Sequence, residues 1–168
     1  GNEGSFVDKV FTWQTNPDGD RAVKVRVCKN RPPIMGDKFA SRCGQKGTFG
    51  MTMPRHDLPY TEDGIIPDFI LDPAGLHKRM TVAQLIEILF GNMACELGFM
   101  GAYNAFEIIN LDQINDILEN KLGMTSYGDR ILYNGKTGEQ MDVKVFSGVI
   151  FYQRLKYIVD EKINKILY

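Results

Sequence analysis

A short glycine-rich segment carries the residues best suited to bind a phosphate group. Residues 35–50 read MGDKFASRCGQKGTFG, and Lys38 and Lys46 stand eight residues apart within it, each close to a glycine. Glycines expose backbone N–H groups and lysines supply positive charge, a combination typical of phosphate sites. The residues alone are equally compatible with one shared site on a phosphodiester chain and with two unrelated surface lysines.

The segment does not match the common nucleotide-binding loops. It contains no Gly-x-x-x-x-Gly-Lys-Ser/Thr sequence, and Gly44, Gly47 and Gly50 follow one another at intervals of three, unlike the dinucleotide fingerprint. A metabolic nucleotide-binding enzyme would need a base, a nucleophile or a cluster of metal ligands, and the sequence shows none of these. A site for a polyanion backbone therefore stays open.

Basic residues concentrate around this segment. From Arg21 to Lys46 there are eight basic residues and one acidic residue, Asp37, a charge of +7, whereas the rest of the chain carries -8. A basic stretch of this kind is either a solvated face or a binding site for a polyanion. The net charge of -1 alone would argue against nucleic acid.

Composition argues for one globular domain that is not all-helical, and the element patterns described below predict a β-rich α+β fold. The chain has 168 residues, 43% hydrophobic and 24% charged, which is ordinary for one soluble globular domain. Its 17 glycines and 7 prolines argue against an all-helical bundle. Three cysteines without a CxxC pair exclude zinc and disulfide scaffolds and favour a reducing, intracellular location. The apolar runs are too short to cross a membrane.

The chain before the glycine-rich segment predicts a β-hairpin. Apolar residues 7–13 and the alternating residues 21–28 predict two strands, joined by the turn sequence NPDGD at residues 16–20. The alternation predicts that the valines of the second strand point inward and its cations outward. Residues 1–5 are expected to be a flexible lead-in or a cloning remnant outside the fold.

The best helix pattern begins at Thr81, whose side chain is expected to form a capping box with Gln84, and ends at Gly98. Its apolar stripe, Val82–Leu97, is expected to be buried, and Cys95 to lie on it as inert packing.

The other elements are less regular. The glycine-rich segment is expected to bend sharply, because it has too many glycines for the interior of a strand or helix. Residues 51–73 are expected to be ordered loop with one short buried strand at residues 69–71. The remaining patterns predict a helix at residues 110–123, strands at residues 130–133, 141–146 and 148–154, and helical spacing at residues 155–167.

Several stretches resemble one known family. GDKFASR at residues 36–42 and GQKG at residues 44–47 closely resemble a loop of the second-largest, β-type subunit of multisubunit DNA-directed RNA polymerases. Other stretches resemble that subunit in the same order: DLPY at 57–60, GIIPD at 64–68, DP at 72–73, KRMTV at 78–82, YNG at 133–135 with TG at 137–138, YQRL at 152–155 and VDEK at 159–162. The resemblance covers roughly residues 21–162.

The resemblance implies roles for individual residues. Lys38 and Lys46 match the lysines that hold phosphates of the RNA 3′ end and the incoming nucleotide, and they are the expected catalytic residues. Arg79 matches an arginine that touches the incoming triphosphate, and Lys162 a lysine near the initiating nucleotide. Phosphoryl transfer depends mostly on positioning and charge neutralisation, which cations on a fixed scaffold supply.

Other positions are expected to tune the site. Gln45 and Arg42 are expected to contribute to substrate binding. Where the family usually has histidine, this chain has Cys43 and Tyr157. A tyrosine can still donate a hydrogen bond to phosphate, whereas a cysteine is a weak donor and is expected to pack as a small hydrophobe.

The resemblance also implies an architecture and an assembly. Residues 6–168 are expected to be a fragment of the hybrid-binding region, forming part of a double-psi β-barrel with an inserted helical segment. The expected partners are the largest subunit and the other core subunits, the RNA–DNA hybrid, template DNA and nucleoside triphosphates. Magnesium is expected at the active site of the whole enzyme, held mainly by the largest subunit and not tightly by this chain. The alternative is a non-catalytic barrel module that binds a nucleic-acid backbone.

Overall fold

The computed structural model describes residues 4–14, 17, 19–102, 104 and 106–166, without the side chains of residues 161, 164 and 165. It divides into two compact units, residues 1–34 and 35–168. Asn16 and Asp18 of the predicted turn lie outside the described residues.

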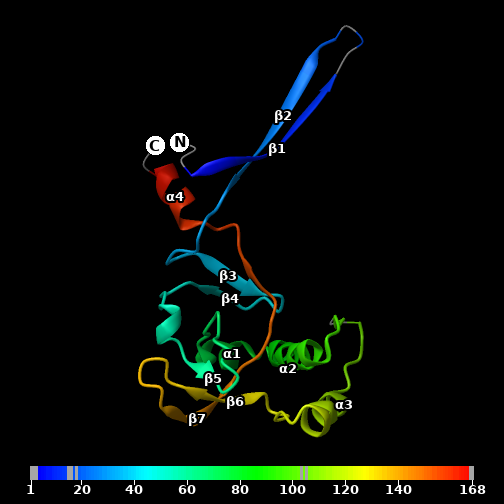
Figure 1. Ribbon diagram of the computed structural model, residues 1–168, viewed down its shortest axis with the longest axis vertical. Helices are drawn as coiled ribbons and strands as arrows, with labels where there is room; N and C mark the ends of the chain where they lie inside the picture. Colours follow the sequence, from blue (N-terminus) through cyan, green and yellow to red (C-terminus); the bar gives the residue numbers. More distant parts are fainter. Residues whose placement is uncertain (1–3, 15–16, 18, 103, 105, 167–168) are drawn as a thin grey trace. The chain divides into compact units, whose positions relative to one another are not determined.

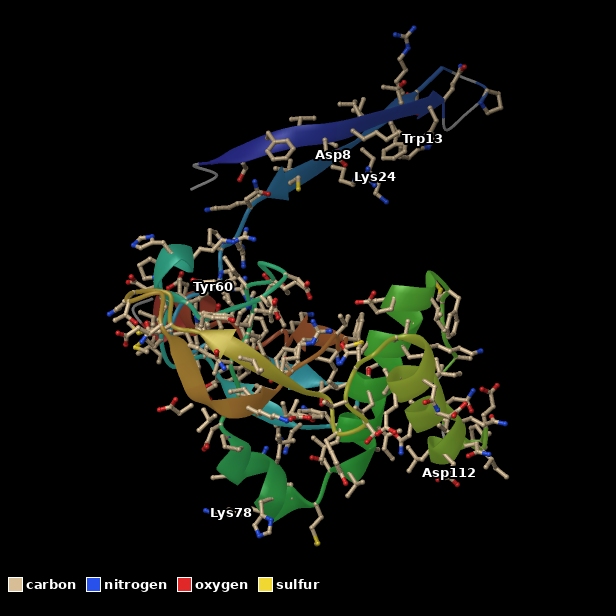
Figure 2. The ribbon with its side chains drawn as sticks, turned by 60° about the horizontal axis from the view of Figure 1, so that its bottom comes forward. Asp8, Trp13, Lys24, Tyr60, Lys78 and Asp112 are labelled. Carbon is tan, nitrogen blue, oxygen red and sulfur yellow. The ribbon has the colours of Figure 1, made fainter. Side chains whose placement is uncertain are left out.

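The first unit is a two-stranded antiparallel hairpin of β1 (Ser5–Gln14) and β2 (Arg21–Lys29), as predicted. The expected burial of its valines is wrong: Val23, Val25 and Val27 are 48–60% exposed. A two-stranded ribbon has no second layer within its own unit to cover an apolar face. Figure 2 labels Asp8, Trp13 and Lys24 on this hairpin.

The second unit contains two three-stranded sheets, with strand orders β4-β3-β8 and β5-β6-β7. All the strand pairs are antiparallel. Figure 1 shows β3 and β4 side by side, and the β6–β7 hairpin as a separate ribbon. The strands are β3 (Lys38–Ser41), β4 (Lys46–Thr48), β5 (Tyr60–Thr61), β6 (Asp129–Tyr133), β7 (Gln140–Phe146) and β8 (Tyr152–Arg154).

Three strand predictions need correction. The glycine-rich segment does contain strands, because β3 pairs on both edges and its backbone hydrogen bonds outweigh the flexibility of Gly47 inside β4. Residues 69–71 form no strand; the Phe69 ring instead packs against Phe39 at 5.6 Å between ring centroids. The predicted strand at 148–154 is shorter, since only Tyr152–Arg154 pair.

The helices are α1 (Pro73–Arg79), α2 (Val82–Leu97), α3 (Leu111–Asp116) with a π-helical continuation (Ile117–Lys121), and α4 (Val159–Ile166); a 3-10 turn spans Arg55–Asp57. The Asn110 side chain caps α3 as predicted. The capping box at α2 is wrong, because Thr81 makes no cap hydrogen bond and Gln84 accepts one from Ser41.

The core of the second unit lies between α2 and α3. Met93, Ile114 and Leu118 form a buried cluster there. Figure 1 shows α2 and α3 as neighbouring helices. The expected apolar burial of α2 is only partly correct, since Val82 is 60% exposed and Leu97 46%.

Polar residues occupy part of the buried side of α2. Gln84, Glu87 and Asn92 are all at most 4% exposed. They hydrogen-bond to β3, to the turn after it and to the segment before β8, which is why this side faces inward despite its polarity. Cys95 is exposed, contrary to expectation. Within the described part of the chain, no helix has the length and hydrophobicity of a membrane span.

Candidate functional site

The pairing of β3 with β4 places Lys38 and Lys46 on one face of the sheet. Lys38 stands opposite Thr48, and Ala40 stands opposite Lys46. Residues that are opposite each other, or two apart on one strand, share a face, so the two lysines are diagonal neighbours. Cα atoms in such diagonal pairs are about 7 to 8 Å apart. The intervening Ala40 is small and 5% exposed.

The third strand extends this face. Gln153 of β8 pairs with Ala40, so its exposed side chain shares the face with the two lysines. We call the side of β4-β3-β8 that bears Lys38, Lys46 and Gln153 the lysine face.

Aromatic residues support the opposite side of the sheet. Phe39 packs there against Phe49, Phe69 and Tyr152, with ring centroids 5.6–6.2 Å away. Phe69 and Tyr152 approach to 4.5 Å between centroids. Such pairs add to the stability of a sheet beyond simple burial. The strands that carry the lysines therefore rest on a packed layer.

The Lys38 side chain meets Lys162 at one tyrosine. The Lys38 Nζ atom lies 4.2 Å from the centre of the Tyr157 ring, and the Lys162 Nζ atom lies 4.8 Å from the same centre. Lys162 also donates a hydrogen bond of 2.6 Å to the Tyr157 hydroxyl. This hydrogen bond and the charge of Lys162, helped by Lys38, lower the pKa of the Tyr157 phenol. Two of the predicted site lysines thus converge.

A buried carboxylate contacts the chain on both sides of this tyrosine. Asp37 is fully buried, forms an ion pair with Arg154 of β8, and accepts a 3.3 Å hydrogen bond from the backbone N–H of Val159 in α4. Gly36 has φ +97°, and a Cβ there would lie 2.9 Å from the Val159 Cγ2 atom. We call Asp37, Lys38, Arg154, Tyr157 and Lys162 the Lys38 cluster.

The buried polar residue beside Lys46 is neutral. Gln45 is 8% exposed and donates to the Gly75 carbonyl at 3.1 Å and the Thr81 hydroxyl at 3.2 Å. Arg79 donates through Nη1 to the Gln45 Oε1 atom at 2.8 Å and to the Lys46 carbonyl at 2.9 Å. We call Gln45, Lys46, Gly75, Arg79 and Thr81 the Lys46 cluster. The exposed Arg79 is thereby tied to the edge strand β4.

The residues between the two strands pair with α2. Arg42 forms an ion pair with Glu87, donating from Nε at 3.0 Å, and its guanidinium lies 5.3 Å from the centre of the Phe151 ring. Burial, with the charge of Glu87, raises the pKa of the Cys43 thiol, so the thiol stays protonated. The Arg42 guanidinium thus contacts Glu87 and Phe151, and its role in substrate binding stays a prediction.

Metal ligation does not fit the lysine face. Ammonium groups do not coordinate a hard divalent cation, which takes oxygen ligands. Among the described residues, no three His, Cys, Asp or Glu side chains gather as a metal site. The residues of this face are suited to an anion.

Sequence reasoning missed some of this arrangement. It did not predict α1, although Asp72, which accepts a hydrogen bond from the Ala74 N–H, followed by Pro73 is a recognisable helix start. The Gln45 amide contacts the protein through both its nitrogen and its oxygen, and its role in substrate binding stays a prediction. Gln153 could have been found from strand alternation once its partner strand was known.

Comparison with known proteins identifies the family. The family model described as RNA polymerase Rpb2, domain 6, matches residues 1–166, including the first five residues. The chain is 44% identical over 162 residues to DNA-directed RNA polymerase II subunit RPB2 of Eremothecium gossypii, covering 96% of this chain and 13% of that protein. It is 43% identical over 156 residues to DNA-directed RNA polymerase subunit 2 of Acanthamoeba polyphaga mimivirus, covering 93% and 13%.

An archaeal protein is similar as well. The chain is 40% identical over 163 residues to DNA-directed RNA polymerase subunit Rpo2 of Saccharolobus shibatae, covering 96% of this chain and 14% of that protein. The chain thus spans about one seventh of the length of these relatives. The match over nearly all of its own length shows that the chain belongs to the family of domain 6 of the RNA polymerase subunit Rpb2.

Proposed function

We propose that this chain is part of the active centre of a DNA-directed RNA polymerase, where its lysine face holds phosphates during nucleotide addition. Lys38 and Lys46 hold the RNA 3′ end and the incoming nucleotide, Arg79 touches the triphosphate, and Lys162 lies near the initiating nucleotide. The observation that carries the proposal is the placement of Lys38 and Lys46 as diagonal neighbours on one face.

The electrostatics of the face support this role. Lys38, Lys46 and Lys162 present ammonium groups; Lys38 and Lys162 both contact Tyr157, and neither pairs with an acidic side chain among the described residues. Charge-assisted contacts to phosphate are about twice as strong as neutral hydrogen bonds. Lys38 and Lys162 are held against Tyr157, so their ammonium groups lose less freedom than unrestrained lysines when a phosphate binds, and cations placed in advance favour the charge that develops during transfer.

The assembly completes what this chain lacks. We propose that β3, β4 and β8 belong to a double-psi β-barrel whose other strands come from elsewhere in the full-length subunit. We also propose that magnesium is ligated mainly by the largest subunit; the ammonium groups of the lysine face do not coordinate a divalent cation. The proposed partners are the largest and other core subunits, template DNA, the RNA–DNA hybrid and nucleoside triphosphates.

The proposal is tested in the assembled polymerase with Lys38→Ala and Lys46→Ala in the full-length subunit. Each change removes a charge-assisted contact of about 1.5 to 3 kcal/mol, so single-nucleotide addition should slow roughly tenfold to a hundredfold. Lys136→Ala, an exposed lysine in the β6–β7 turn, is the matched control and should add nucleotides at the parental rate.

Two outcomes would contradict the proposal. Parental addition rates in both lysine variants, with normal assembly, would remove the phosphate role. Weaker retention of nucleic acid with an unchanged addition rate at saturating nucleotide would favour the non-catalytic backbone-binding module.

A further inference from the structure

Each lysine of the lysine face follows a buried polar residue. Asp37 precedes Lys38 and is fully buried; Gln45 precedes Lys46 and is 8% exposed. In the part of the chain that the structure describes, the hydrogen bonds of both side chains reach residues that are distant in the sequence, not the lysine that follows. We propose that Asp37 is a positioning residue that holds Tyr157 and Lys162 against Lys38, an inference that rests on the proposed function for its kinetic consequences.

The contacts of Asp37 join three elements. One carboxylate oxygen, Oδ2, pairs with Arg154 of β8, and the other, Oδ1, accepts from the Val159 N–H of α4. Asp37 itself leads directly into β3. The two partners flank Tyr157 in the sequence, three residues after one and two residues before the other. One buried carboxylate therefore anchors both ends of the short segment that carries Tyr157.

The position of Lys162 follows from the same anchor. Lys162 lies three residues beyond Val159, close to one turn along α4. Its ammonium donates to the Tyr157 hydroxyl, and Lys38 lies over the ring of the same residue. The orientation of α4 thus decides whether the two lysines meet at the tyrosine.

Close packing reinforces the anchor. Gly36 lies against the Val159 side chain, so tightly that a Cβ would approach the Cγ2 atom to 2.9 Å. The Leu155 N–H donates to the Lys38 carbonyl at 2.8 Å, which continues the pairing of β3 with the chain after β8. The first of these contacts, like the Asp37 to Val159 hydrogen bond, reaches α4, whereas the second holds the chain after β8 to β3.

The experiment measures lysine reactivity in the assembled polymerase that carries Asp37→Asn. Competitive labelling with acetic anhydride, read by peptide mass spectrometry, reports each amine separately and does not depend on catalysis. Loss of the contacts at Tyr157 should raise the labelling rates of Lys38 and Lys162 about threefold or more. Lys46 and Lys136 should keep their parental rates.

Gln45→Ala is the matched variant, because it removes the buried polar residue before the other lysine. It should leave the labelling of Lys38 and Lys162 unchanged. If Asp37→Asn prevents assembly, Arg154→Lys keeps both charges while it removes the guanidinium geometry, and it should give the same pattern with a smaller size.

Labelling and kinetics separate this inference from the proposed function. Parental reactivity of Lys38 and Lys162 in the assembled Asp37 or Arg154 variant would overturn the inference, as would an equal rise at all four lysines, which indicates general loosening. If labelling changes as expected while Lys38→Ala adds nucleotides at the parental rate, the inference stands and the proposed function fails. If both hold, Asp37→Asn lowers kcat with little change in the apparent nucleotide KM, since Arg79 is untouched.

Discussion

In both the Lys38 cluster and the Lys46 cluster, a buried polar residue directly precedes the lysine. That residue is charged in the first cluster and neutral in the second. In the first, a buried carboxylate pairs with an arginine 117 residues later and a backbone N–H 122 residues later. In the second, a buried neutral amide contacts groups 30 to 36 residues away. Both clusters place a lysine on the same face.

Each lysine therefore depends on the rest of the chain in a different way. A buried ion pair is costly to break from one side, because the remaining charge loses its partner in a low-dielectric setting. Neutral hydrogen bonds lose less when one member is removed. A single substitution is therefore expected to cost more stability in the Lys38 cluster than in the Lys46 cluster.

The largest effect is expected for Gly36→Ala, at the residue that precedes Asp37 of the Lys38 cluster. A left-handed backbone costs a non-glycine residue about 1 to 3 kcal/mol. The close approach to Val159 adds to that cost, since the new methyl group must displace a packed side chain. Hydrogen exchange in the full-length subunit should show faster opening of β3 and α4.

Gly47→Ala is the control for this change in the Lys46 cluster. Gly47 lies in β4, and a Cβ at this position would meet no atom within 4 Å, so exchange should stay near the parental pattern. Equal effects of the two alanines would remove the distinction between the clusters.

A smaller effect is expected for Arg79, which belongs to the Lys46 cluster. Both hydrogen bonds to Gln45 and Lys46 use its Nη1 atom, so an arginine can hold the loop with one nitrogen while the rest of its fork meets phosphate. Arg79→Lys should already be impaired, and Arg79→Ala should lower kcat/KM for nucleotide addition roughly tenfold to a hundredfold.

Retention of a preformed RNA hybrid is measured on the same stalled complex and should stay near normal. Lys78→Ala is the control, because Lys78 precedes Arg79 on α1 and is exposed at the outer end of that helix in Figure 2. If Arg79→Ala weakens hybrid retention as much as addition, Arg79 supports the fold or the RNA and not the triphosphate.

The smallest effect concerns the ionisation of Tyr157 in the Lys38 cluster. Its phenol pKa is lowered, first by the Lys162 hydrogen bond and then by charge. The folded state therefore favours phenolate: the added attraction is fully present above the ordinary tyrosine pKa and is lost as pH falls through the lowered value. Nitration by tetranitromethane, which attacks phenolate, should show a lowered pH midpoint at Tyr157.

Two variants rank the causes of that shift. Lys162→Met should raise the midpoint more than Lys38→Met, since Lys162 both hydrogen-bonds to the hydroxyl and supplies charge. The reverse order would mean that the phenol responds mainly to Lys38.

Local patterns in the sequence predicted the parts of the fold that depend on neighbours along the chain. The hairpin of β1 and β2, the helix α2 ending at Gly98, and the Asn110 cap of α3 followed from alternation, periodicity and end signals. The spacing of Lys38 and Lys46 left two interpretations open, and only the register of β3 with β4 places both on one face.

The rest depended on pairings across long stretches of chain. No local signal shows that Asp37 meets Arg154, or that Gln84 and Glu87 turn inward to serve Ser41 and Arg42. For the valines of β2, a local pattern was present but its interpretation was wrong. Alternation predicts that they share one face, but not whether another layer covers that face.

The long sequence separation between Asp37 and Arg154 also delays their pairing during protein synthesis. Asp37 leaves the ribosome 117 residues before Arg154, which is about 6 to 23 s at about 5 to 20 residues per second. During that interval β3 has β4 on one edge and an open edge on the other, where β8 will later pair. Nascent chains are thus exposed to mispairing at the strand that carries Lys38, and slower translation would lengthen that exposure.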